Sequence, residues 1–216
     1  MAGFRRAAVF LLAACFVLVL FLSNFRLLVF NESYYDSEFR KLGVYDEYPE
    51  AGVISGNIIG FFKGNEDLSE AFSEREAKHL FDVKELINKS LLFFYFAFLI
   101  EIFLFTLFFA LDKKSFLDVF VKTVVYGSSL VLVLSAVLFI FSFSSLFSSF
   151  HSLFFAEGTW LFPSESVLIS VFPEKFFYDF FFRVAFYSCV ESFLAVLFCF
   201  FAKERKKIKK FLNEKI

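Results

Sequence analysis

LLFFYFAFLIEIFLFTLFFAL, residues 91–111, is a run of 21 residues in which Glu101 is the single charged side chain. About 20 apolar residues in a helix are enough to cross the hydrocarbon core of a bilayer, which is roughly 30 Å thick. Lipid offers the backbone no hydrogen-bond partner, so a segment that spans it must be helical. The sequence therefore predicts a membrane-spanning helix over these residues.

Three other stretches have the same character, and the chain as a whole is 59% hydrophobic. Soluble domains are about 45–50% apolar, so this composition is typical of a membrane protein. We predict a mainly α membrane protein with four transmembrane helices and a small extracytoplasmic domain. The expected divisions are a first transmembrane helix (1–30), an extracytoplasmic domain (31–90), the second and third transmembrane helices with a short cytoplasmic loop (91–150), an outer interfacial segment (151–179), a fourth transmembrane helix (180–202) and a basic cytoplasmic tail (203–216).

Lysine and arginine next to the spans predict the orientation, because short basic flanks stay in the cytoplasm. Arg5 and Arg6 precede the first span, and Lys113 and Lys114 lie between the second and the third. The segment after the fourth span is also basic, whereas residues 31–90 carry an acidic excess. These observations predict a multi-pass protein of the cell membrane with both termini cytoplasmic. The formal net charge of −1 gives no reason to expect a nucleic-acid partner.

The predicted extracytoplasmic domain contains several local signals. Ser73 followed three residues later by Glu76 is a capping box and predicts a helix start. A shorter helix is expected from Ser55 to Gly64, and Ser164 is a candidate cap for another short helix before Pro173. The aromatic and charged segment 34–48 contains turn residues and is compatible with a short strand pair.

The chain has only two histidines, His79 and His151, and the predicted topology places both on the outer side. Histidine suits proton transfer near neutral pH. Asp82 lies three residues after His79, on the same helix face, where a carboxylate can orient the imidazole. The alternatives are a solvated His79 and a His151 that only anchors a helix end at the interface.

The two histidines can share a site only if the helices allow it. A straight helix would carry His79 about 18 Å above the span that starts at Leu91. We therefore predict a bend near residues 88–90. His151 is expected to end a continuous helix over 124–150, about 40 Å long.

Two further carboxylates, Glu101 and Glu191, fall within predicted spans. Ionisable residues in a membrane are costly and often functional. They support a second hypothesis, a small transporter or proton-coupled channel, beside the simpler interpretation of a structural polar pair. The three cysteines lie in apolar runs, and no metal-binding motif is recognised, so we expect no metal site and no cofactor.

Several segments resemble a family of small four-span bacterial membrane proteins that includes the lipoprotein intramolecular transacylase. The resemblance covers most of the chain in order and lies in Tyr34–Phe39 (YYDSEF), His79–Lys84 (HLFDVK), His151–Phe155 (HSLFF), Gly158–Trp160 (GTW) and Phe172–Asp179 (FPEKFFYD).

The resemblance implies an acyltransferase that acts on diacylated lipoproteins and membrane lipid without a cofactor. One acyl chain would move from the glyceryl ester to the amine of the N-terminal cysteine, giving a lyso-form lipoprotein. His79 and His151 would be catalytic at the outer face, with Asp82 as the orienting group. Trp160 and Tyr35 would shape the lipid-facing pocket. A non-catalytic membrane scaffold remains an alternative, and the sequence leaves the oligomeric state open.

Overall fold

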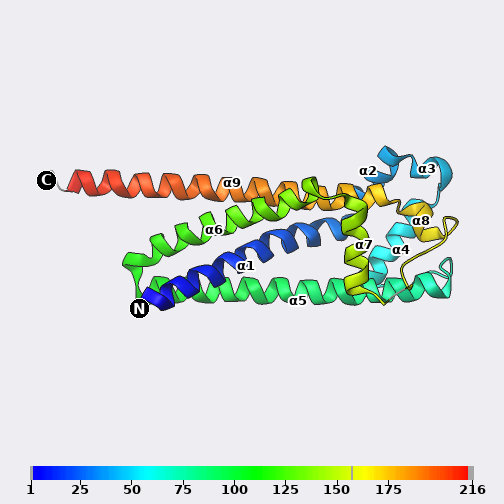
Figure 1. Ribbon diagram of the computed structural model, residues 1–216, viewed down its shortest axis with the longest axis horizontal. Coiled ribbons are helices and arrows are strands. Elements are labelled where there is room, and N and C mark those ends of the chain that lie inside the picture. Colours follow the sequence, from blue (N-terminus) through cyan, green and yellow to red (C-terminus); the bar gives the residue numbers. More distant parts are fainter. Residues whose placement is uncertain (1, 157, 214–216) are drawn as a thin grey trace. The chain divides into compact units, whose positions relative to one another are not determined.

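The computed structural model describes residues 2–156 and 158–213, and within these residues every regular element is a helix (Figure 1). The elements are α1 (Ala2–Val29), α2 (Glu32–Leu42), α3 (Val44–Glu47), α4 (Ala51–Lys63), α5 (Glu74–Leu111), α6 (Lys113–Ile140), α7 (Phe143–Phe154), α8 (Val167–Val171) and α9 (Glu174–Asn213). Four helices are long and apolar enough to cross a membrane, over Gly3–Val29, Glu74–Leu111, Lys113–Leu138 and Glu174–Arg205. The predicted mainly α class with four spans is thus confirmed. The last three residues of the predicted tail, 214–216, lie outside the described part.

The described residues form two compact units. The first unit comprises Met1–Leu22, Phe93–Val137 and Ala185–Ile216, and the second comprises Ser23–Leu92 and Leu138–Val184. The second unit contains both histidines and all the short helices.

The first unit has a small apolar core and a large apolar surface. Ala8, Val9 and Leu12 of α1 pack with Phe108 and Val119. Large side chains on α5 point outward and are 62–64% exposed: Phe93, Phe96, Leu99 and Phe103. Such an apolar surface is unusual for a soluble monomer and suits contact with lipid chains.

A close helix contact in the first unit depends on a glycine. A Cβ atom on Gly127 of α6 would lie 2.5 Å from Cδ1 of Phe16 on α1. Small residues let helix backbones approach closely in membranes, where water does not drive association. Gly127 therefore leaves the space that the ring of Phe16 fills.

The core of the second unit is aromatic. The rings of Tyr35, Phe39, Phe172 and Phe176 lie 5.2–6.3 Å apart. Aromatic pairs prefer tilted or edge-to-face contacts at such distances. These contacts join α2 to the segment around the start of α9.

The strand pair considered for residues 34–48 is wrong, because helices α2 and α3 occupy this segment. The side chain of Asn31 caps α2 by accepting a hydrogen bond from the Tyr34 N–H at 3.2 Å. Gly43 ends α2 with a φ of 71°, a left-handed conformation that glycine adopts without a steric penalty. The end signals of the helix therefore outweigh the strand preference of its aromatic residues.

Other predicted helix ends are partly confirmed. Ser73 and Glu76 form the predicted capping box, with the Ser73 N–H donating to Glu76 Oε2 at 2.9 Å and the Glu76 N–H donating to Ser73 Oγ at 3.3 Å. Helix α4 ends at Lys63 with Gly64 as its C-cap, close to the predicted end, but it begins at Ala51 instead of Ser55. Ser166, not Ser164, caps α8.

The predicted bend near residues 88–90 is also wrong. Helix α5 continues unbroken through this region, whereas α6 ends at Ile140 and α7 starts afresh at Phe143 (Figure 1). The expected continuous helix over 124–150 is therefore interrupted at Phe141 and Ser142. Ser142 has a φ of −59° and a ψ of 128°, which is not helical. Serine is suited to helix starts because it competes for backbone hydrogen bonds inside a helix.

Candidate active site

The structure brings the two histidines together in the second unit. His79 lies on α5 and His151 on α7, and their ring centroids are 6.0 Å apart with the planes at 24°. The side chains are buried, with exposed fractions of 8% and 9%. The alternative in which His79 is merely solvated is therefore wrong. The pair forms although α5 is unbroken, because α7 is a separate helix.

His151 has a defined tautomer. Its Nδ1 lies 2.8 Å from the carbonyl oxygen of Phe147, one turn earlier on α7. A carbonyl only accepts, so Nδ1 carries the proton and Nε2 keeps its lone pair in the neutral ring. Burial lowers the pKa of His151 from its usual 6.5, against a smaller opposing effect of the bond to Phe147. The ring is therefore a neutral base at neutral pH.

His79 differs from His151 in having an unused polar atom. Its Nδ1 is buried and has no hydrogen-bond partner among the described residues. Burial without a counter-charge favours the neutral imidazole over the cation. Buried polar atoms without a partner are uncommon in native structures and call for an explanation. A group on a bound substrate would satisfy this nitrogen.

The environment of the two rings is aromatic. Phe155 lies 4.8 Å from His79 and 5.4 Å from His151, measured between ring centroids. Trp160, which we predicted to shape the lipid-facing pocket, lies 4.8 Å from His151, and Phe162 lies 5.4 Å from His79. Apolar walls exclude water and strengthen the polar interactions of a bound substrate.

The first turn of α5 holds the segment that carries these aromatic residues. Arg75 donates hydrogen bonds to the carbonyl oxygens of Gly158 and, at 2.5 Å, of Leu161. Its guanidinium also lies 5.5 Å from the ring of Phe162. Glu76, which is 3% exposed, accepts a hydrogen bond from the Leu168 N–H at 3.0 Å. These contacts were not predicted, because the partners of Arg75 and Glu76 are backbone groups, and the residue type does not indicate which backbone group will form such a bond.

We expect Arg75→Ala to loosen the segment over the histidines. Bonds from an exposed arginine stabilise by about 1 kcal/mol, so the open form should become about fivefold more populated. Trp160 is the only tryptophan, so its fluorescence reports on this segment alone. The emission should shift to the red and acrylamide should quench it more strongly. Lys78→Ala, which removes an exposed cation one turn away, is the control, and equal spectra for both variants would contradict the prediction.

Two predicted site residues lack the expected contacts. Asp82 is half-buried and, within the described residues, forms no hydrogen bond with His79. Tyr35 is 5% exposed and its hydroxyl donates to the Val29 carbonyl at 3.0 Å. Burial raises the pKa of Tyr35. Its ring contacts lie in the aromatic core of the second unit and involve neither histidine, so the contacts of Tyr35 are structural.

A family model described as lipoprotein intramolecular transacylase Lit matches residues 10–177 of the chain. The chain belongs to the Lit family. The Lit family is a family of acyltransferases, and the match includes both histidines.

Known structures show the same fold for the Lit family. The membrane-integral lipoprotein intramolecular transacylase Lit from Bacillus cereus matches with a TM-score of 0.81 and 18% identity, over 96% of this chain and 100% of that one. Variants of that protein with one histidine replaced by arginine or alanine match with TM-scores of 0.75, again over 96% of this chain, and over 96% and 97% of theirs. An uncharacterized protein from Aquifex aeolicus (strain VF5) is 33% identical over 109 residues. That alignment spans 50% of this chain and 47% of the relative, so it covers about half the length of each.

The two carboxylates of the transport hypothesis lie in the first unit of this Lit family member. A cavity of about 490 Å³ in this unit is lined by neither Glu101 nor Glu191. Lys122, another ionisable residue of this unit, pairs with Asp118 at 2.8 Å. Within the described residues, no group of three or more His, Cys, Asp or Glu side chains is placed to hold a metal ion.

Proposed function

We propose that this member of the Lit family moves an acyl chain within a diacylated lipoprotein. The chain passes from the glyceryl ester to the amine of the N-terminal cysteine and leaves a lyso-form lipoprotein. The observation that carries the proposal is the pair of buried, neutral imidazoles 6.0 Å apart, one of them with a fixed tautomer. Membership of a family named for this reaction supports the same conclusion.

The proton steps follow from the two rings. The α-amino group of a cysteine has a pKa of about 8, so a neutral imidazole is basic enough to take its proton during attack. In our proposal Nε2 of His151 accepts that proton as the amine nitrogen bonds to the ester carbonyl carbon. The C–O bond to glycerol then breaks, and the imidazolium returns the proton to the leaving oxygen. One amide forms, one ester is lost and the protons balance.

His79 acts in this scheme as the partner of His151. Its unused Nδ1 can hold the glyceryl oxygen or the amine in place while the proton moves. The nucleophile and the ester belong to one molecule, so holding a compact conformation supplies much of the acceleration. The aromatic walls, including Trp160, accommodate the acyl chains. The reaction needs no cofactor and no covalent intermediate on the protein.

The site is assigned to the outer face of the membrane. Basic flanks at Arg5, Lys113 and Lys203 favour a cytoplasmic location for these ends of the four spans, and this supports an outer location for residues 31–90 and 151–179. Diacylglyceryl esters lie at the headgroup level of the outer leaflet. The substrate can therefore reach the two histidines from the membrane without leaving it.

The proposal is tested with a strain whose lipoproteins carry only the diacylglyceryl group. Expressing the wild-type chain should leave the total lipoprotein mass unchanged while one acyl chain moves to the cysteine amine. Tandem mass spectrometry of the N-terminal peptide distinguishes the amide from the ester. An N-terminal amine that stays free in the presence of the folded protein would end the proposal.

A further inference from the structure

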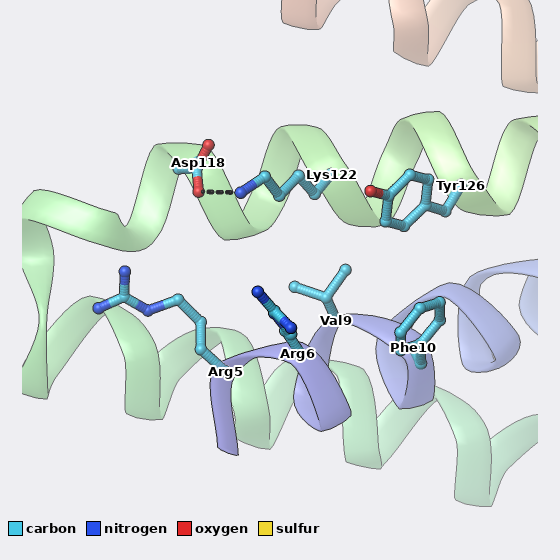
Figure 2. Close-up of a pocket in the computed structure, with 7 residues that line it drawn as sticks. All are labelled: Arg5, Arg6, Val9, Phe10, Asp118, Lys122 and Tyr126. Atoms are coloured by element: carbon cyan, nitrogen blue, oxygen red, sulfur yellow. Dashed lines mark hydrogen bonds and ion pairs between the residues drawn. The ribbon is translucent and has the colours of Figure 1, made fainter. Parts of the chain in front are cut away.

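A second polar site lies in the first unit, between α1 and α6. The cavity of about 490 Å³ is lined by Arg5, Arg6, Val9, Phe10, Asp118, Lys122 and Tyr126 (Figure 2). Its walls are basic near the starts of the two helices and aromatic further along them. Neither the acyl-transfer proposal nor the packing of the bundle accounts for a cavity of this kind.

Among the described residues that line the basic end, Arg6 is the cation without an ion-pair partner. Arg5 pairs with Asp112 at 2.8 Å, and Lys122 pairs with Asp118 at 2.8 Å. Arg6 is exposed and, among the described residues, makes no hydrogen bond or ion pair. Figure 2 shows Arg6 on α1, across from Lys122 on α6. Three cations thus face two carboxylates, and the excess positive charge lies on Arg6.

The other end of the cavity is apolar and exposed. The rings of Phe10 and Tyr126 are stacked, with centroids 6.0 Å apart and the planes at 12°. They are 66% and 47% exposed. Both helices run from the basic end toward these rings, since the Arg5–Asp112 pair joins their starts. A ligand that fills the cavity therefore meets charge first and apolar surface beyond it, along the direction into the membrane.

We propose that this cavity binds one anionic phospholipid. Its phosphodiester lies between Arg6 and Lys122, and the upper part of an acyl chain lies against Phe10 and Tyr126. Basic pockets between transmembrane helices are suited to anionic headgroups, and each cation near the surface contributes about 1 kcal/mol. Asp118 stays bound to Lys122, so Arg6 provides the attraction that distinguishes an anionic headgroup from a zwitterionic one. The site is independent of the proposed acyl transfer.

Native mass spectrometry of the full-length protein in detergent tests the proposal. The protein is mixed with equal amounts of phosphatidylglycerol and phosphatidylcholine that have the same acyl chains. The wild type should retain phosphatidylglycerol in preference, with one molecule bound most tightly. Arg6→Glu should lower the ratio of the two bound lipids at least about fivefold, and Arg6→Lys should largely preserve it.

Lys114→Glu is the matched control, because it makes the same change in net charge near the start of α6 but does not line the cavity. A ratio that falls equally in Arg6→Glu and Lys114→Glu would overturn the proposal, as would a wild type without preference. Inorganic phosphate is added in a separate arm. Displacement of phosphatidylglycerol by millimolar phosphate would reveal a site for free anions and would also overturn the assignment to a lipid.

Discussion

His151→Gln is expected to lower the rate of lyso-form production by about 10²- to 10⁴-fold, the usual contribution of a general acid or base. Glutamine has a similar size and can still donate a hydrogen bond to the Phe147 carbonyl, which His151 contacts at 2.8 Å. It has no basic nitrogen, so the loss reports on the proton transfer and not on packing. The measurement is the initial rate at which the N-terminal cysteine amine becomes acylated, with equal amounts of folded protein in the membrane.

The controls for this prediction come from the same two helices. Ser149→Ala lies on an exposed position of α7 and should retain the full rate. His79→Gln should also lower the rate strongly, and the double variant should be little worse than either single one, because residues that act as a unit are not additive. A His151→Gln protein that works within threefold of the wild type would show that His151 is not the base.

Much of the fold could be predicted from the sequence because long apolar runs have few alternatives in a membrane. Residues 91–111 illustrate this, since neither a strand nor a loop can satisfy 21 backbone groups in lipid. The capping box at Ser73 was equally predictable, as it depends on neighbours in the chain. The two histidines could be selected because the chain contains no others.

The sequence did not reveal features that depend on contacts distant in the chain. The interruption at Phe141 and Ser142 lies in a stretch whose phenylalanines and serines fit a continuous helix equally well. Tyr35 resembled a pocket residue, but its burial against Phe172 and Phe176 becomes visible only in the fold. Asp82 is at the correct helical spacing from His79, yet spacing alone does not direct a side chain toward its neighbour.

The buried carboxylate of Glu38 is expected to contribute strongly to the stability of the second unit. This residue is 0% exposed, and its oxygens accept hydrogen bonds from Arg183 and Lys41, each at 2.9 Å. Lys41 also bonds to Asp179 at 2.9 Å, and these bonds raise the pKa of Lys41. A buried charge is tolerated only when opposite charges compensate it, so removing one partner from such a cluster is costly. The cluster joins α2 to the first turns of α9.

We expect Glu38→Gln to destabilise the protein by about 3 kcal/mol, toward the lower end for a broken buried pair because both cations are partly exposed. For a chain of this size, such a loss corresponds to a fall in Tm of about 6–12 °C. Thermal unfolding in detergent, followed by circular dichroism at a fixed scan rate, measures it. Glu47→Gln removes an exposed carboxylate on the neighbouring helix α3 and should change Tm little. If the two variants melt within about 2 °C of each other, Glu38 is not a principal support of this unit.

The effect of Glu38 should extend to the histidines through aromatic contacts. Phe177, in the part of α9 that Arg183 anchors, lies 5.3 Å from Phe147, and Phe147 lies 4.2 Å from His151. A loosened α9 removes the support behind the α7 turn whose carbonyl fixes the tautomer of His151. At temperatures well below its Tm, the Glu38→Gln protein should therefore have a lower acyl-transfer rate than the wild type, whereas the Glu47→Gln protein should not. If the Glu38→Gln protein has a lowered Tm but the acyl-transfer rate of the wild type, α7 keeps His151 in place without support from α9.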